Sequence, residues 1–178
     1  MKSEDSVKDF MFEHSILDRI MLLFEKIIKS NKNISSKYIK TLITIIKVLI
    51  EHHHEKMEEK YVFPMITTHE NKKIVDRLIY EHKLSKQITN KIIKYSMNDE
   101  IYNKNLNLIK KLLIYFIRMY RYHESYENIQ IYPEFERNIT KQEYNKINDL
   151  VEENEKMILG KINISDIINV IIKIEKIL

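Results

Sequence analysis

The sequence predicts an all-α fold, an antiparallel four-helix bundle of up-down-up-down topology with one or two extra helices at the C-terminus. The chain has 178 residues but only one Gly and two Pro, so turn signals are few and long helices with short connections are expected. In four segments the apolar residues recur every three or four positions, which marks one buried face of a packed helix. A histidine falls on each of these faces. Two helical hairpins of this kind assemble into a bundle whose interior often holds metal ions.

The first two predicted helices form one hairpin. The first begins near Val7 and ends at the polar stretch 30–36, and its apolar face includes His14. The second runs over about 38–63, with His54 on its buried stripe. Pro64 follows, and it is expected to stop the helix because proline lacks an N–H and clashes with the preceding turn.

The next two predicted helices form the second hairpin. Thr67 and Glu70 have the spacing of a capping box, which predicts the start of the third helix. That helix ends before the break at 98–99. The fourth helix then runs on to Pro133, which is expected to end it for the same reason that Pro64 ends the second.

Two further helices are predicted after the second hairpin. Thr140 and Glu143 form another capping-box pattern, and Gly160 suits the position that follows a helix end. A last apolar helix covers about 166–178. Residues 1–135 are thus predicted to form the bundle domain and 136–178 a C-terminal helical extension. The extension is expected to pack over the bundle or to form an interface with a protein partner or a second copy of the chain.

The composition excludes several kinds of site and partner. The chain has no Cys, which rules out disulfides, thiolate zinc sites, iron–sulfur ligation and thiol catalysis. The formal net charge of +4 is small and spread along the chain, so nucleic acid is not expected as a partner. Met1 to Glu4 are polar and no apolar run is long enough to span a bilayer. We therefore expect no cleavable secretory signal, no membrane association and a cytoplasmic location.

A duplicated sequence pattern, called the cassette below, contains most of the candidate metal ligands. The pattern HxxxExxxx(F/Y)P occurs once at residues 54–64 and once at 123–133, and each copy has a further Glu-His pair upstream. A His and a Glu four positions apart lie on one helix face, so both can reach the same metal. The repeat selects six candidate ligands: His14, His54, Glu58, His82, His123 and Glu127.

These six residues are expected to meet in one layer of the bundle. In antiparallel helices, residues equally far from the connecting turn lie at the same level, and the four histidines match within roughly two turns. The arrangement that suits the chemistry gives each of two ions two histidines, with Glu58 and Glu127 bridging between them. Bridging anions are needed because two divalent cations repel in a dry core. Imidazole with carboxylate suits iron, zinc, copper or nickel better than calcium.

With these residues the chain resembles the hemerythrin-like HHE cation-binding domain family over about residues 10–135. The resemblance implies a four-helix bundle around a non-haem di-iron centre, with the six residues above as the metal ligands. It implies two Fe ions joined by an oxo or hydroxo bridge as the cofactor, with zinc as the second choice. It further implies that the centre binds, senses or reacts with O2, NO or peroxide.

One departure from the family bears on function. Oxygen-carrying hemerythrins use a fifth histidine one turn from the third-helix ligand. Here the positions four residues before and four residues after His82 hold Leu78 and Lys86. The chain is therefore more similar to the four-His, two-Glu subgroup, which includes proteins that repair iron centres after oxidative or nitrosative stress. Reversible oxygen storage and a metal-stabilised bundle that binds a partner without catalysis are the alternatives. The sequence leaves open whether the protein is an enzyme, and a metal-binding stress or sensor protein is favoured.

Several neighbours of the candidate ligands are expected to be structural. Consecutive helical residues point about 100° apart, so only one of the three adjacent histidines can face the buried seam between the helices, and register selects His54 with His53 as the fallback. Most acidic neighbours are expected to be solvated, with a slight preference for Glu81 as a partner of a ligand imidazole. Core packing is the favoured role of three nearby tyrosines. The residues concerned are His52, His53 and His69, Glu13, Glu59 and Glu81, and Tyr61, Tyr120 and Tyr126.

Overall fold

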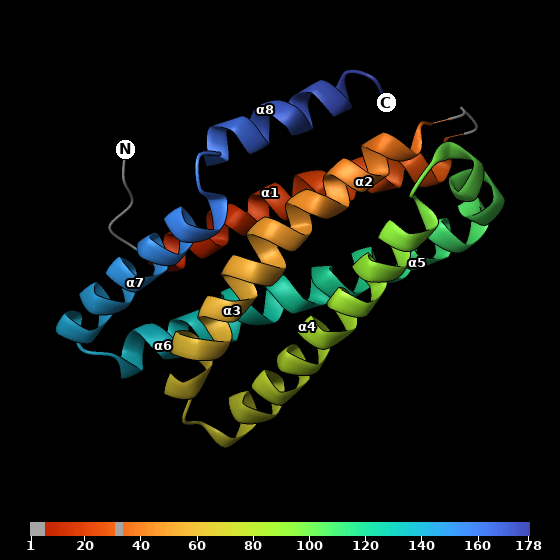
Figure 1. Ribbon diagram of the computed structural model, residues 1–178. Helices are drawn as coiled ribbons and strands as arrows, with labels where there is room; N and C mark the ends of the chain where they lie inside the picture. Colours follow the sequence, from red (N-terminus) through yellow and green to blue (C-terminus); the bar gives the residue numbers. More distant parts are fainter. Residues whose placement is uncertain (1–5, 31–33) are drawn as a thin grey trace.

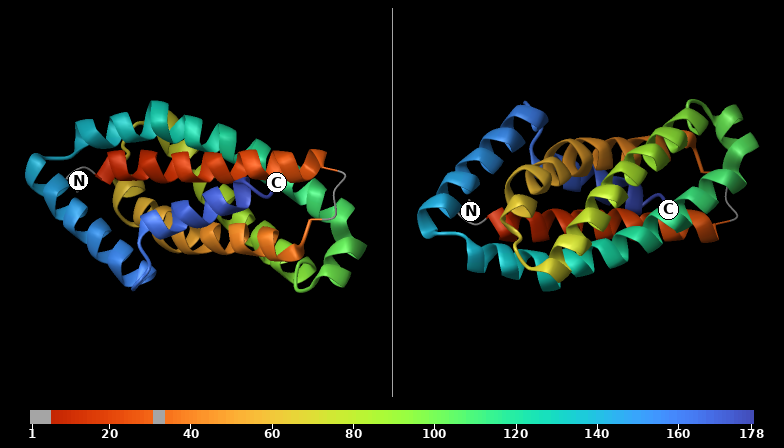
Figure 2. Two further views of the ribbon diagram at one scale, coloured as in Figure 1. Left: turned by 90° about the horizontal axis from the view of Figure 1, so that it is seen from above. Right: turned by 90° about the horizontal axis from the view of Figure 1, so that it is seen from below.

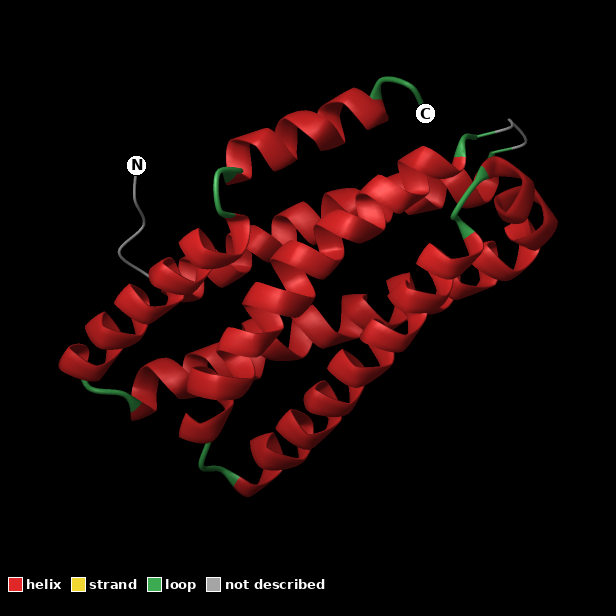
Figure 3. Ribbon diagram, in the orientation of Figure 1, coloured by secondary structure: helices red, strands yellow, loops and turns green. Residues whose placement is uncertain are grey.

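The computed structural model describes residues 6–30 and 34–178, and within these ranges every regular element is a helix (Figures 1 and 3). The predicted all-α class is confirmed. Met1 to Glu4, on which the expectation about a secretory signal rested, lie outside the described residues. Among the helices of the described part, none is both long and apolar enough to cross a membrane.

Four long helical stretches carry the predicted apolar faces, and two further helices follow. The second and fourth stretches are composite, because π-helical turns interrupt their α-helices. The elements are α1 (Ser6–Lys29); α2 (Ser36–Ile45), η1 (Ile46–His54), α3 (Glu55–Met57), η2 (Glu58–Val62) and η3 (Phe63–Met65); α4 (His69–Tyr95); α5 (Asp99–Tyr126), η4 (Glu127–Ile131) and α6 (Tyr132–Asn138); α7 (Lys141–Leu159); and α8 (Ile164–Glu175).

The four long stretches surround one common interior. Helix α1 packs against α5 and against η1 of the second stretch, while α4 packs against α5, α2 and η1. The second stretch also contacts the fourth, through α2 with α5 and η3 with α6. Consecutive stretches run in opposite directions (Figures 1 and 2). Helices α7 and α8 cover the face formed by α1 and the second stretch, away from α4. The C-terminal helices therefore lie on one side of the molecule only.

A polar layer divides the core into two apolar clusters. One cluster includes Leu17, Ile50 and Phe116, and the other includes Phe10 and Phe63. The four repeat-related histidines fall in sequence between members of the two clusters on each stretch. Burying an aliphatic or aromatic side chain contributes about 1.5–3 kcal/mol, so the two clusters can offset the cost of a dry polar layer between them.

The two prolines are accommodated by π-helical turns that begin at the cassette glutamates. In η4 the N–H of Tyr132 donates to the carbonyl of Glu127, and in η2 the N–H of Phe63 donates to the carbonyl of Glu58. The wider turn puts each proline at the start of a new helical segment, where a missing N–H costs nothing. The prediction that Pro133 ends its helix is wrong for this reason, since α6 continues to Asn138.

The helix caps agree with the sequence in the extension and differ at α4. Thr140 and Glu143 form the predicted capping box at the start of α7, and Gly160 follows α7 with a φ of 60°. The capping box expected at the start of α4 is absent, because its N-cap residue makes no side-chain cap hydrogen bond. The carboxylate of Glu134 takes over this role from α6.

Glu134 holds the start of α4 with several hydrogen bonds. Its Oε1 accepts from the backbone N–H groups of Thr67 and Thr68, both at 2.8 Å. Its Oε2 accepts from Thr68 Oγ1 at 2.7 Å and from Asn71 Nδ2 at 2.5 Å. Burial alone would raise the pKa of Glu134, but the hydrogen bonds from Thr68, Thr67 and Asn71 outweigh burial and lower the pKa to about 2.

The variant Glu134→Gln is expected to lower the free energy of unfolding by about 2 kcal/mol at pH 7, the range for hydrogen bonds to a charged group. A carboxyl whose pKa is lower in the folded state stabilises the protein above its unfolded pKa of about 4.3. This contribution disappears as the pH falls towards the folded pKa of about 2. Urea unfolding followed by circular dichroism at pH 7 and at pH 3 measures both effects.

Glu136→Gln is the matched control, because Glu136 is exposed on the same helix α6. It should leave stability unchanged at either pH. Equal effects of the two substitutions at pH 7, or a difference that stays constant into the acid range, would show that Glu134 does not cap α4 as an ionised group.

Candidate metal centre

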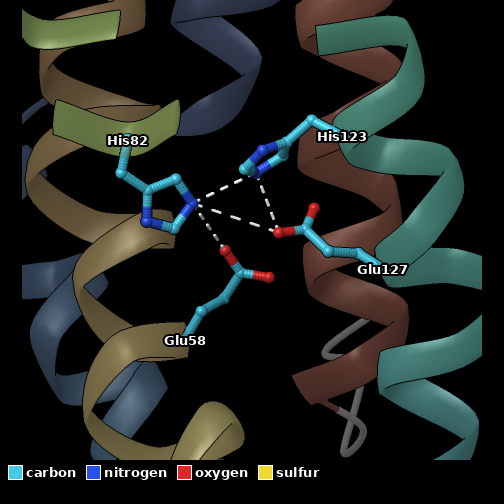
Figure 4. Close-up of side chains that lie close together, drawn as sticks. All are labelled: Glu58, His82, His123 and Glu127. Atoms are coloured by element: carbon cyan, nitrogen blue, oxygen red, sulfur yellow. Dashed lines mark hydrogen bonds and ion pairs between the residues drawn. The ribbon is translucent and has the colours of Figure 1, made fainter. Parts of the chain in front are cut away.

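Four of the six predicted ligands meet in the polar layer. Glu58 from η2, His82 from α4, His123 from α5 and Glu127 from η4 each offer one ligand atom, and these atoms lie within 4.8 Å of one another. Figure 4 shows their side chains pointing toward one another from the surrounding helices. The Nε2 atoms of His82 and His123 are 3.1 Å apart, and Glu127 Oε1 lies 2.9 Å from His123 Nε2.

The other two predicted ligands form a second histidine pair beside the first. The Nε2 atoms of His14 and His54 are 3.1 Å apart, and Glu127 Oε2 lies 3.2 Å from His14 Nε2. Glu58 Oε2 lies 3.4 Å from His54 Nε2 and 3.7 Å from His82 Nε2. Both carboxylates therefore stand between the two histidine pairs. The structure brings all six residues together, and their role as metal ligands stays a prediction.

The outer nitrogen of every one of these imidazoles has a fixed partner. An ionised carboxylate can only accept a hydrogen bond, so an Nδ1 that faces one must carry the hydrogen, which leaves the lone pair on Nε2. This pattern is typical of histidine ligands, whose second nitrogen donates to a carboxylate or an amide oxygen. The pairs are His14 with Asn128 at 3.2 Å, His54 with Glu13 at 2.7 Å, His82 with Glu59 at 2.9 Å and His123 with Glu81 at 3.0 Å.

These partners repeat the twofold order of the ligands. Glu13 and Glu81 each precede one histidine in the chain but contact the histidine of the adjacent stretch. Glu59 and Asn128 each follow a cassette glutamate. The expectation that most acidic neighbours are solvated is wrong, because Glu13 and Glu81 are buried and all three glutamates accept from a ligand imidazole. The adjacent Glu-His pairs in both repeats were the sequence signal for two of them.

The two cassette carboxylates differ in their surroundings. Burial raises the pKa of Glu58, and the negative charge of Glu127 raises it further. Burial also acts to raise the pKa of Glu127, but the charge and hydrogen bond of His123 outweigh it and lower that pKa. Burial by itself would lower the pKa of His123, yet the charge of Glu127 raises it. A proton between His123 and Glu127 thus partly compensates the negative charge of the layer when no cation is there.

Aromatic side chains enclose the layer. The ring of Phe63 stacks on His82 with centroids 5.7 Å apart, and the ring of Tyr132 stacks on His14 at 6.0 Å. Phe63 and Tyr132 occupy the same position of the two cassettes. Only Tyr132 has a hydroxyl, and it donates to Glu58 Oε1 at 2.7 Å. Sequence reasoning did not single out Tyr132, although its place in the repeat identifies it as the partner of Phe63.

The remaining tyrosines and histidines near the candidate ligands lie outside the inner layer. Tyr120 is buried, where it donates to Glu55 and Ser85, and Tyr61 and Tyr126 pack at the edge of an apolar cluster, as expected. His52 and His69 are exposed. Of the three adjacent histidines, His54 faces the layer of predicted ligands, as expected, whereas His53 is buried as completely but faces Glu13 and Asn154 instead.

The positions expected for a fifth histidine have other contacts. Leu78 is fully buried in one of the apolar clusters. The ammonium of Lys86 lies 3.2 Å from Glu55 Oε2. In the described part of the chain the inner cluster therefore contains four histidines and two glutamates, the set that the repeat selected.

A metal fits the donors that this layer offers. Glu58 Oε2 and Glu127 Oε2 are buried without a hydrogen-bond donor, and leaving a buried carboxylate uncompensated costs several kcal/mol. Lone pairs that face each other also repel unless a cation lies between them. Two nitrogens about 2.1 Å from one ion and at a right angle to each other would be about 3 Å apart, and both histidine pairs have a separation of 3.1 Å. The buried cluster can hold a metal ion.

The fold and the cluster together define an all-α protein with a buried His/Glu group suited to metal. No family model matches the chain, and no solved structure matches it. The chain is similar to three curated proteins: Uncharacterized protein Rv1995 and Uncharacterized protein MT2051 of Mycobacterium tuberculosis, and Uncharacterized protein Mb2018 of Mycobacterium bovis. Each is 22% identical over 174 residues, which cover 95% of this chain and 68% of the relative. Their names state no activity.

The variant Glu58→Gln is expected to change the melting temperature in opposite directions with and without metal. In the metal-free protein it removes a carboxyl group whose ionised form is disfavoured by burial and by the charge of Glu127, and replacement of buried charged groups is often stabilising by about 1–4 kcal/mol. The melting temperature should therefore rise. With metal the substitution removes a ligand, so the melting temperature should fall below that of the metal-loaded wild type. Calorimetry with and without added divalent metal measures both shifts.

Glu100→Gln is a suitable control, because Glu100 is an exposed residue whose ion pair with Lys104 is exposed as well. Such a pair contributes little to stability, so both melting temperatures should match those of the wild type. A metal-free Glu58→Gln protein that melts below the wild type would contradict the charge balance described for the layer.

Proposed function

We propose that this chain is a hemerythrin-like, non-haem di-iron protein of the cytoplasm that binds, senses or reacts with O2, NO or peroxide. The observation that supports it best is the orientation of the four imidazoles. Each Nδ1 is hydrogen-bonded to an oxygen, and the Nε2 atoms converge in two pairs at 3.1 Å. Two pairs of histidines joined by Glu58 and Glu127 suit two ions better than one.

The donor set favours iron among the metals that accept imidazole and carboxylate. Structural zinc sites are closed tetrahedra that lack a position for a further ligand. In this layer Glu58 and Glu127 face both histidine pairs, so each ion would receive two nitrogens of its own and share the carboxylates. A pair of iron ions would supply electrons and open coordination positions for a small oxidant.

The protein residues around the layer would control what reaches it. Phe10, Phe63 and Tyr132 surround the histidines with rings and are nearly fully buried, which favours small apolar ligands over solutes that need water. The hydroxyl of Tyr132 donates to Glu58 Oε1 and so leaves only Oε2 of that carboxylate facing the histidines. The two half-sites are therefore not equivalent in their hydrogen bonding.

A protein that reacts with an oxidant is favoured over an oxygen store. The fifth-histidine positions hold Leu78 and Lys86, and a ligand set of four histidines and two glutamates is the one that the iron-repair subgroup shares. Partner binding by the C-terminal helices stays a prediction.

Protein purified without oxygen and reconstituted with Fe(II) is expected to hold about two iron ions per chain. Admission of air should then produce new near-UV absorption, because two oxidised iron ions absorb where two ferrous ions do not. Metal analysis and anaerobic optical titration with O2 and with NO measure these properties. His82→Gln should lower the iron content, whereas His69→Gln, on the same helix but exposed, should not.

Three results would replace the proposal by another function. Stoichiometric zinc that iron cannot displace would indicate a structural metal. A spectrum that reverts under vacuum would indicate reversible oxygen storage. Bound metal that raises the melting temperature without any reaction with O2, NO or peroxide would indicate a metal-stabilised bundle.

A further inference from the structure

A third group of potential ligands lies beside the inner layer, between the bundle and α7. It consists of Glu13 from α1, His53 from η1 and Glu155 from α7, whose ligand atoms lie within 4.8 Å of one another. Glu13 and His53 are buried, while Glu155 is half-buried. None of the six residues of the inner layer belongs to this group.

His53 is oriented in the same way as the four inner histidines. Its Nδ1 lies 2.9 Å from Asn154 Oδ1, an amide oxygen that accepts the hydrogen of Nδ1. The lone pair of Nε2 then points at Glu13 Oε1, 3.3 Å away. Nε2 has no hydrogen-bond partner although the residue is only 1% exposed. A buried imidazole nitrogen and a carboxylate oxygen that face each other require a positive charge between them, which either a proton or a metal ion supplies.

The electrostatic surroundings favour a cation at this place. Burial raises the pKa of Glu155, and the negative charges of Glu13, Asp9 and Glu152 act in the same direction. Four carboxylates thus contribute to one region, with the imidazole of His53 among them. The donors within reach of one ion are an imidazole nitrogen of His53 and carboxylate oxygens of Glu13 and Glu155, and such donors suit a divalent transition metal.

This third group occurs in only one half of the repeat, whereas the six residues of the inner layer occur in both halves. The position that corresponds to His53 in the second cassette is Tyr122, which is 65% exposed. Helix α7 covers only the side where His53 lies, and it supplies both Asn154 and Glu155. The C-terminal extension therefore completes a set of ligands that the duplicated part of the chain does not contain.

We propose that Glu13, His53 and Glu155 form an additional site for one divalent transition-metal ion, closed by α7. The site is linked to the inner layer through a single side chain. Glu13 offers Oε1 to the new site, while its Oε2 accepts from Nδ1 of His54 at 2.7 Å. Occupation of the new site thus acts on the carboxylate that orients an inner imidazole.

The test compares Glu155→Gln with Glu153→Gln in the full-length protein, using zinc as a redox-inert probe. Glu153 is exposed on the same helix and carries the same charge, which makes it a matched control. Equilibrium dialysis against zinc, with metal analysis of the retained protein, counts the bound ions. Glu155→Gln should hold about one zinc ion fewer per chain, or bind that ion at least about tenfold more weakly. Glu153→Gln should match the wild type.

The same comparison in a His82→Gln/His123→Gln background separates this proposal from that for the inner layer. The difference between the two α7 variants should persist there, whatever the inner layer retains. Equal zinc content and equal affinity of Glu155→Gln and Glu153→Gln would overturn the additional site. It would mean that a proton, rather than a metal, lies between His53 and Glu13.

Discussion

The structure depends on the compensation of charge in a dry layer. Two carboxylates and four imidazoles are buried between two apolar clusters, and a buried charge without a partner costs several kcal/mol. The clusters supply the hydrophobic stabilisation that makes such a layer affordable. Glu58 Oε2 and Glu127 Oε2 are buried without a hydrogen-bond donor. A cation in the layer would compensate both carboxylates and would be faced by the Nε2 atoms of the four imidazoles.

The outer contacts of the layer explain how one geometry is selected. Each imidazole is held by an acceptor on the adjacent stretch, and the acceptors follow the twofold order of the ligands. The π-helical turns η2 and η4 begin at Glu58 and Glu127, and such turns are frequent at functional sites. Each cassette proline therefore follows a π-helical turn that begins at the cassette glutamate. Pre-organisation of this kind lowers the cost of binding a metal.

The sequence was sufficient to predict the features that depend on residues close together in the chain. The spacing of His, Glu and Pro in the repeat was enough to select the six residues that meet, and apolar periodicity was enough for the all-α class. The sequence pattern was insufficient for contacts between residues that are far apart in the chain. Glu134 replaced the local cap of α4, and the docking of α7 brought Asn154 and Glu155 to His53. None of these follows from spacing along one helix.

We infer that the six repeat-related residues hold two metal ions. Anomalous diffraction at the iron absorption edge, from crystals of protein loaded with Fe(II) without oxygen, tests it most directly. Two peaks are expected, one beside the Nε2 atoms of His14 and His54 and the other beside those of His82 and His123, with Glu58 and Glu127 reaching both. The absence of iron from the layer, or a single peak within it, would contradict the claim.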